Sequence, residues 1–168
     1  MTTQPYYAKV DTELRRGHFT ANERYAQDLY SDATKIDPWS GEWPPTDTGS
    51  SGLAIAQVLR NRGDISSYAH AFSTDAALDA LVNTAVIIGI PWFNGMFDPD
   101  TNGFLSPTGE IAGGHEVCLN EINVEDQYVE GPNSWSRGWG PLGGRFRLKW
   151  DVLDELLSND GDCTIFIA

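Results

Sequence analysis

The sequence has few basic residues. Its 168 residues include 11 Lys and Arg against 24 Asp and Glu, which gives a formal net charge of −13. An acidic chain repels the phosphate backbone of nucleic acids and the anionic surface of membranes. We therefore expect no nucleic-acid partner and no membrane partner.

Cysteine and metal-binding patterns are also scarce. The two cysteines, Cys118 and Cys163, are too few for a disulfide scaffold; one bridge between them stays open, but buried free thiols are favoured. No CxxC pair or Cys/His cluster has zinc spacing, and the three histidines are far apart in the sequence. Residues 98–103 resemble the first half of a calcium loop, but the final acidic ligand is misplaced, which favours a β-turn. We expect no metal and no cofactor.

Long apolar runs are absent. The longest, residues 85–92, is interrupted by Gly89 and Pro91 and is far shorter than the roughly 18 residues of a membrane span. Residues 1–16 are polar and lack the apolar region of a signal peptide. We therefore expect no signal peptide, and the compartment stays unknown.

Helical patterns dominate the first half of the chain and strand patterns the second. Apolar residues at helical spacing predict helices, whereas β-branched or alternating runs predict strands. The predicted helices are 24–35, 53–61, 75–81 and 151–158, and the predicted strands are 84–92, 145–150 and 163–168. Residues 1–19 look irregular. Helices followed by strands argue for an α+β fold.

Capping residues predict where the helices begin and end. Thr20 starts a capping-box pattern, which predicts it as the N-cap of the first helix. The other predicted ends are Ser50 or Ser51 before the second helix, Gly63 after it, and Ser73 or Thr74 before the third.

The most informative pattern is a histidine behind two glycines, followed later by an Asn-Ser-Trp run. The glycines leave room around the imidazole of His115, and Asn133 and Trp135 follow in that order. An asparagine that accepts a hydrogen bond from one imidazole nitrogen fixes the tautomer and leaves the other nitrogen to act as a base. Trp135 would cover that hydrogen bond and exclude water. From these residues alone, a purely structural histidine stays open.

These motifs resemble those of the papain-like cysteine peptidases. That family carries a GGHA-type strand and then an NSWG..WG..G.F run, and this chain has GGHEV and then NSWSRGWGPLGGRF. Residues 75–90 look like the helix and strand before the family's histidine, and residues 48–53 (TGSSGL) look like its cleft loop. The resemblance covers about residues 18–168 and is nearest to the phage and actinobacterial branch. Ser136 departs from the pattern, because the family usually has glycine there.

The resemblance implies a single papain-like domain over residues 1–168 with an α+β fold that is N-terminally truncated. It implies a tail (1–19), a helical lobe (20–72) and a mainly antiparallel, β-barrel-like lobe (73–168), with a cleft between the lobes. His115 matches the family's catalytic base and Asn133 its orienting partner. The residues that match substrate-binding positions are Gly49, Ser50, Ser51, Gly52 and Trp135.

The family's nucleophile has no counterpart in this pattern. That nucleophile is a cysteine at the start of a long helix upstream of every aligned segment, whereas the first cysteine here is Cys118. Cys118 lies three residues after His115 on the same expected strand, so the two side chains should face opposite ways. Cys163 has the pattern of a buried structural residue. A serine nucleophile, Ser50 or Ser51, is a weaker interpretation than a helix cap.

Two functions remain open from the sequence. The first is a catalytically impaired papain-fold relative that acts as a binding or structural protein, such as a phage virion component located in the virion or the host cytoplasm. The second is the His/Asn-bearing part of a papain-like cysteine peptidase or amidase whose cysteine helix comes from another chain or is missing from the sequence. Either function implies a protein or peptide partner.

The missing helix also bears on assembly. In the family that helix is the apolar spine of the helical lobe, so without it Tyr25, Leu29, Leu53 and Leu59 would share an uncovered face. Soluble monomers rarely expose an apolar patch of several hundred Å². Residues 1–19 are too polar to cover it well. We therefore expect a homo-oligomer or a place in a larger assembly.

Overall fold

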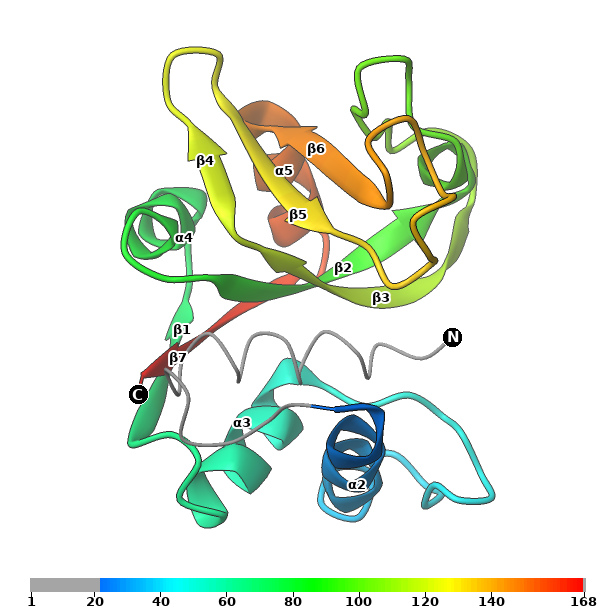
Figure 1. Cartoon of the computed structure of the whole chain (residues 1–168), viewed down its shortest axis with the longest axis vertical. Helices are drawn as coiled ribbons and strands as arrows, with labels where there is room; N and C mark the ends of the chain where they lie inside the picture. Colours follow the sequence, from blue (N-terminus) through cyan, green and yellow to red (C-terminus); the bar gives the residue numbers. More distant parts are fainter. Residues whose placement is uncertain (1–21, 168) are drawn as a thin grey trace. The chain divides into compact units, whose positions relative to one another are not determined.

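The structure is a computed structural model that describes residues 22–167. The predicted tail 1–19 and the predicted cap Thr20 lie outside them. The described chain divides into two compact units: unit 1 contains residues 22–69 with 166 and 167, and unit 2 contains residues 70–165. The chain passes from one unit to the other within strands β1 (Ser67–Ala71) and β7 (Asp162–Ile167) (Figure 1). No helix within residues 22–167 has the length and apolar character needed to cross a membrane.

Unit 1 is built on two helices, α2 (Glu23–Ala33) and α3 (Gly52–Asn61). Helix α2 begins after Asn22, whose side chain accepts a hydrogen bond from the backbone N–H of Tyr25 at 2.9 Å. The prediction of Thr20 as the N-cap is wrong, because Asn22 is as good a cap and starts the helix two residues later.

Helix α3 begins and ends as predicted. Ser51 is the N-cap, and its hydroxyl accepts a hydrogen bond from the backbone N–H of Ala54 at 3.2 Å. Gly63 follows the helix with a φ of +73°, the left-handed conformation that commonly stops a helix.

The apolar faces of α2 and α3 are largely buried. Leu29 and Leu59 have no exposed surface, Tyr25 is half-buried, and Leu53 is 43% exposed. The prediction of an uncovered face is therefore wrong for Leu29 and Leu59. Periodicity identifies which side of a helix is apolar but not what packs on it. The expected self-association is therefore no longer supported by an uncovered apolar face, and it stays a prediction.

Unit 2 contains most of a four-stranded sheet with the order β1-β7-β2-β3. Strand β2 (Val86–Phe93) pairs antiparallel with both β7 and β3 (Ile111–Leu119). The core residues of β2 alternate along it: Val86, Ile88, Ile90 and Trp92. Helix α4 (Thr74–Leu81), capped by the hydroxyl of Ser73, packs its apolar face into the same core, so the predicted cap is confirmed.

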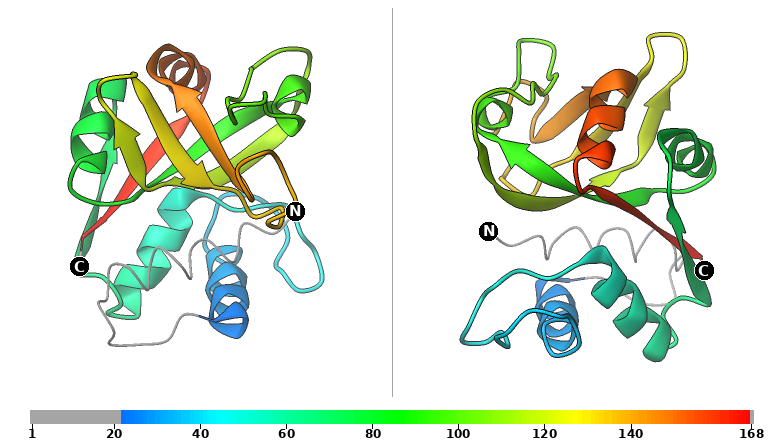
Figure 2. Two further views of the ribbon diagram at one scale, coloured as in Figure 1. Left: turned by 45° about the horizontal axis from the view of Figure 1, so that its top comes forward. Right: turned by 180° about the vertical axis from the view of Figure 1, so that it is seen from behind.

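A second sheet of unit 2 is antiparallel and has three strands. In spatial order these are β4 (Glu121–Asn123), β5 (Tyr128–Pro132) and β6 (Arg145–Lys149). Phe146 and Leu148 of β6 are fully buried, so the predicted alternation is confirmed. Trp150, predicted as the last strand residue, instead begins helix α5 (Trp150–Ser158), which packs against β2 and β6 (Figure 2). The helices and antiparallel sheets make the fold α+β, as predicted.

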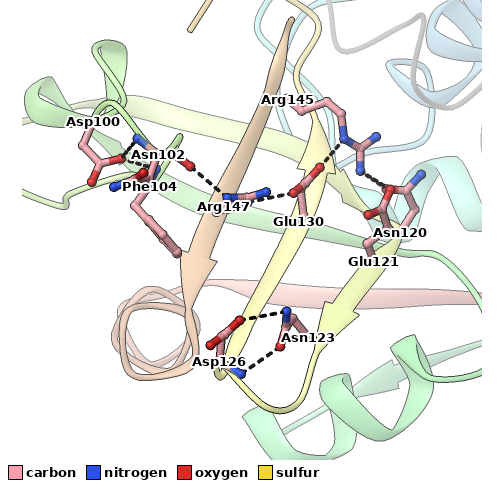
Figure 3. Close-up of polar contacts among 10 residues, drawn as sticks. All are labelled: Asp100, Asn102, Phe104, Asn120, Glu121, Asn123, Asp126, Glu130, Arg145 and Arg147. Atoms are coloured by element: carbon pink, nitrogen blue, oxygen red, sulfur yellow. Dashed lines mark hydrogen bonds and ion pairs between the residues drawn. The ribbon is translucent and has the colours of Figure 1, made fainter. Parts of the chain in front are cut away.

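An ion-pair network joins the three strands of the second sheet (Figure 3). The carboxylate of Glu130, which is 8% exposed, accepts hydrogen bonds from Nε of Arg145 at 2.5 Å and Nε of Arg147 at 2.8 Å. Arg145 also donates to Asn120 and Glu121 at 2.9 and 2.7 Å. Burial pushes the pKa of Glu130 up, but the two guanidinium groups outweigh it and hold the pKa below its ordinary value. The network therefore fixes β5 between its neighbours.

We expect Glu130→Gln to destabilise the protein by about 1 to 3 kcal/mol at neutral pH, because two half-buried guanidinium groups lose their anion. A depressed carboxyl pKa stabilises the fold above the ordinary value of 4.5, and this contribution is lost as the pH falls below it. Urea unfolding should therefore show a smaller difference between the two proteins at about pH 3 than at about pH 7.

The matched control is Glu121→Gln, because Glu121 pairs with Arg145 from a side chain that is 63% exposed. Exposed pairs contribute little, so the control should unfold close to the wild type. Equal destabilisation by both variants would show that the buried carboxylate has no special role.

Candidate functional site

His115 lies on β3 with its ring turned toward the core of unit 2. It pairs with Ile90 across the antiparallel ladder, and only 6% of its surface is exposed. A Cβ built on Gly113 or Gly114 would meet no atom within 4 Å, so the backbone before the histidine borders open space. The prediction of room around the imidazole is wrong, because the ring itself packs against Trp92 and Trp135 and the open space lies at the two glycines.

Asn133 fixes the proton position on His115. Its Oδ1 lies 3.0 Å from Nε2 of His115 and also accepts a hydrogen bond from the backbone N–H of Ser134 at 2.8 Å. The N–H of Ser134 needs an acceptor, so the amide presents its oxygen to both groups. An amide oxygen only accepts, so Nε2 of the neutral imidazole carries the hydrogen and Nδ1 carries the lone pair. The predicted contact between His115 and Asn133 is confirmed.

Trp135 covers this hydrogen bond, as predicted. Its ring stacks on the imidazole of His115 with a centroid distance of 5.0 Å and an interplanar angle of 24°. Phe97, in the short 3₁₀ helix η1 (Asn94–Phe97), stacks in turn on Trp135 at 5.2 Å and 6°. Asn133 itself is 5% exposed. The hydrogen bond is therefore shielded by aromatic side chains.

Burial controls the charge of the imidazole. Desolvation lowers the pKa of His115, and the hydrogen bond to Asn133 opposes this only in part. His115 is therefore neutral at pH 7 and holds an available lone pair on Nδ1, which is the state required of a general base.

Neither cysteine supplies a nucleophile next to His115. Both are buried free thiols, as predicted. Cys118 pairs with Ile87, and its odd-numbered separation from His115 along β3 places the two side chains on opposite faces. Cys163 lies in β7, where burial first, and then the negative charges of Asp162 and Glu116, raise its pKa to about 12. A thiol with such a pKa is not a thiolate at neutral pH.

The predicted substrate-binding loop, Gly49, Ser50, Ser51 and Gly52, lies in unit 1 at the start of α3. Asp47 tethers it, because its Oδ1 accepts hydrogen bonds from the Tyr30 hydroxyl at 2.5 Å and from the backbone N–H of Gly49 at 3.3 Å. Burial first, and then the hydrogen bond to Asp47, raises the pKa of Tyr30. The N-cap interpretation of Ser51 is confirmed, and the binding role of the loop stays a prediction.

Sequence reasoning missed the aromatic residues behind the site. Trp92 contacts His115 at 4.8 Å between ring centroids, with the planes at 83°. Trp139 donates from Nε1 to the backbone oxygen of Phe97 at 2.8 Å, which anchors η1. A signal for Trp92 existed: the two-residue period of a strand places it on the same face as Ile88 and Ile90, but only strand pairing brings that face to His115.

Metal ligation has no support in the part of the chain that the structure describes. No group of three His, Cys, Asp or Glu residues within residues 22–167 could hold a metal ion. The segment from Asp100 to Gly103 is a turn: Asp100 Oδ1 accepts hydrogen bonds from the backbone N–H groups of Asn102 and Phe104, both at 2.8 Å (Figure 3). The predicted turn is confirmed.

Known protein structures share this fold, although no family model and no curated protein matches the sequence. Xylellain, a cysteine protease from Xylella fastidiosa, superposes with a TM-score of 0.54 at 16% identity over 98% of this chain and 70% of its own. A digestive procathepsin L 3 from Tenebrio molitor gives 0.60 at 13% identity, over 98% of this chain and 61% of its own. The proform of the ragweed cysteine protease Amb a 11 gives 0.55 at 16% identity, over 96% and 58%.

These likenesses establish the class of fold. The chain has the α+β fold of the papain-like cysteine proteases, as the motifs predicted. It spans between 58% and 70% of the length of these three structures. At such low identities the likeness shows the fold alone.

We expect Asn133→Asp to raise the pKa of His115, because a carboxylate would replace a neutral amide 3.0 Å from Nε2. An opposite charge at this distance moves the titration midpoint up by about 1 to 2 pH units. NMR titration of the imidazole signals measures it. Asn102→Asp, which adds the same charge in an exposed turn, should leave the midpoint in place; equal shifts in both variants would contradict the assigned contact.

Ser136 has a φ of +80°, a conformation that suits glycine and explains why the resembling family usually has glycine there. We expect Ser136→Gly to stabilise the protein by about 0.5 kcal/mol, because relief of backbone strain outweighs the lost hydrogen bond from Gly138 N to its hydroxyl. Thermal unfolding measures this gain. Ser134→Gly, at a residue without positive φ, should instead destabilise.

Proposed function

We propose that this chain carries the general base of a papain-like cysteine peptidase or amidase and acts with a thiol supplied from outside these 168 residues. The observation that carries the proposal is the hydrogen bond from His115 Nε2 to Asn133 Oδ1, with the lone pair left on Nδ1. A histidine needed only for packing does not require this choice of tautomer.

Each group then has a chemical task. Nδ1 of His115 accepts the proton of the thiol, so that the thiolate attacks the carbonyl carbon of a peptide or amide. The resulting imidazolium returns its proton to the leaving amine and keeps its Nε2–H bond to Asn133 throughout. Burial keeps His115 neutral beforehand, and Trp135 excludes water from the hydrogen bond. The loop Gly49–Gly52 is proposed to contact the peptide.

A second candidate is a binding protein without turnover, and the burial of both thiols favours it for the chain acting alone. The partner would again be a peptide or protein, and the chain would function in a homo-oligomer or a larger assembly. A phage virion is the setting that the sequence resemblance suggests.

We expect the isolated chain neither to hydrolyse peptides nor to react with a thiol-directed epoxide, because Cys118 and Cys163 are buried and Cys163 has a raised pKa. Mass spectrometry after incubation with the epoxide and a peptide library measures both properties. The denatured chain should alkylate at both cysteines, which serves as the control. Epoxide labelling of either native cysteine together with turnover would contradict the proposal.

The source of the thiol is tested by expressing the chain with the residues encoded in frame before Met1. A peptidase should then gain one reactive cysteine and cleave peptides, and His115→Ala should reduce the rate by about 10²- to 10⁴-fold. His70→Ala is the matched control, since it changes a histidine outside the site. If no cysteine is encoded there and no other chain restores cleavage, the binding function replaces the peptidase function.

A further inference from the structure

Trp92 packs against both His115 and Trp135, the tryptophan that stacks on the imidazole. Its side chain is 2% exposed, and its centroid lies 4.8 Å from that of His115 and 5.0 Å from that of Trp135. Its plane is nearly perpendicular to both, at 83° and 74°. Edge-to-face contacts of this kind stabilise one relative orientation of two rings rather than contact in general.

The two tryptophans restrict different motions of the imidazole. Trp135 stacks on the face of the His115 ring at 24°, which opposes tilting but still allows the rings to slide or turn in parallel planes. The ring of Trp92 lies nearly perpendicular to the imidazole, at 83°, and so opposes sliding and in-plane rotation of the imidazole. Together they leave one orientation, the one that directs Nε2 to Asn133.

The backbone of Trp92 lies in a paired strand, whereas that of Trp135 lies in a loop. Trp135 belongs to the loop after β5, is partly exposed and precedes Ser136, whose φ is +80°. Trp92 belongs to β2 and is paired with Gly113 of β3, the strand that carries His115. The position of Trp92 relative to His115 is thus fixed by strand pairing, and Trp135 rests against it.

We propose that Trp92 is a positioning residue that locks the ring of His115 and thereby maintains the Nε2–H tautomer. It contacts the base rather than any reacting atom. Its consequence for turnover rests on the proposed function, whereas the effect on the imidazole does not.

The test compares Trp92→Leu with Trp139→Leu in the 168-residue chain. Trp139 is the matched control because it packs on Trp92 and Trp135 at 6.5 and 5.3 Å, while no ring contact with His115 is found for it in the described chain. Two-bond ¹H–¹⁵N spectra report which imidazole nitrogen carries the hydrogen. We expect the ratio of Nε2–H to Nδ1–H forms to fall about tenfold in Trp92→Leu and to stay within about twofold in Trp139→Leu.

A wild-type ratio in Trp92→Leu would overturn the proposal, and so would an equal loss in both variants, since that would indicate general loosening of the core. Trp92→Phe covers the case in which Trp92→Leu fails to fold. The buried indole N–H of Trp92 has no hydrogen-bond partner within residues 22–167, so phenylalanine removes no such bond and keeps most of the ring volume. Its ratio should lie between those of wild type and Trp92→Leu; a wild-type ratio would refute the lock.

The readout requires no thiol and no substrate. Loss of the tautomer preference in Trp92→Leu, together with no peptidase activity in the chain extended with the residues encoded before Met1 or supplied with another chain, would keep the positioning role and reject the proposed function. An unchanged ratio in Trp92→Leu, together with peptidase activity of the extended chain, would reject the positioning role and keep the proposed function.

Discussion

The close approach of strand β5 to strand β3 at Gly131 is the constraint on which the site depends. A Cβ on Gly131 would lie 1.9 Å from the backbone oxygen of Cys118, so only glycine lets the two main chains come this close. Two residues further along, Asn133 reaches His115, which lies on β3 just before Cys118. Strands β5 and β3 contact each other (Figure 1). Any larger residue would separate the two strands and with them the base from its orienting group.

Two groups of side chains stabilise this crossing, the close approach of β5 to β3: one surrounds Glu130 and the other surrounds His115. On the outer face of the second sheet, Glu130 clamps Arg145 and Arg147 and keeps β5 in register immediately before the crossing. On the inner side, Trp92 and Trp135 enclose the imidazole immediately after it. The first group is an ion-pair network around a buried carboxylate, and the second is a set of apolar rings.

The sequence predicted the parts of the site that local motifs encode. His115, Asn133 and Trp135 come together as expected because each lies in a short recognisable pattern. The predicted start of α2 was wrong because Thr20 and Asn22 are both good caps, and only tertiary structure selects between them. Trp92 was missed because its role depends on the pairing of β2 with β3, a relation between distant segments. The burial of Leu29 and Leu59 depends likewise on packing that no periodicity specifies.

The hydrogen bond from Ser134 to the Asn133 side chain has a consequence for what the chain can tolerate. Within residues 22–167, the contact of position 134 with this pair is its main-chain N–H, which donates to the same oxygen that His115 uses. Its own side chain is therefore free to change with little effect on the imidazole. Proline is the exception, because it lacks the N–H, and without that donor the amide could turn its nitrogen toward the histidine. Position 134 is thus restricted through its main-chain N–H, which excludes proline there.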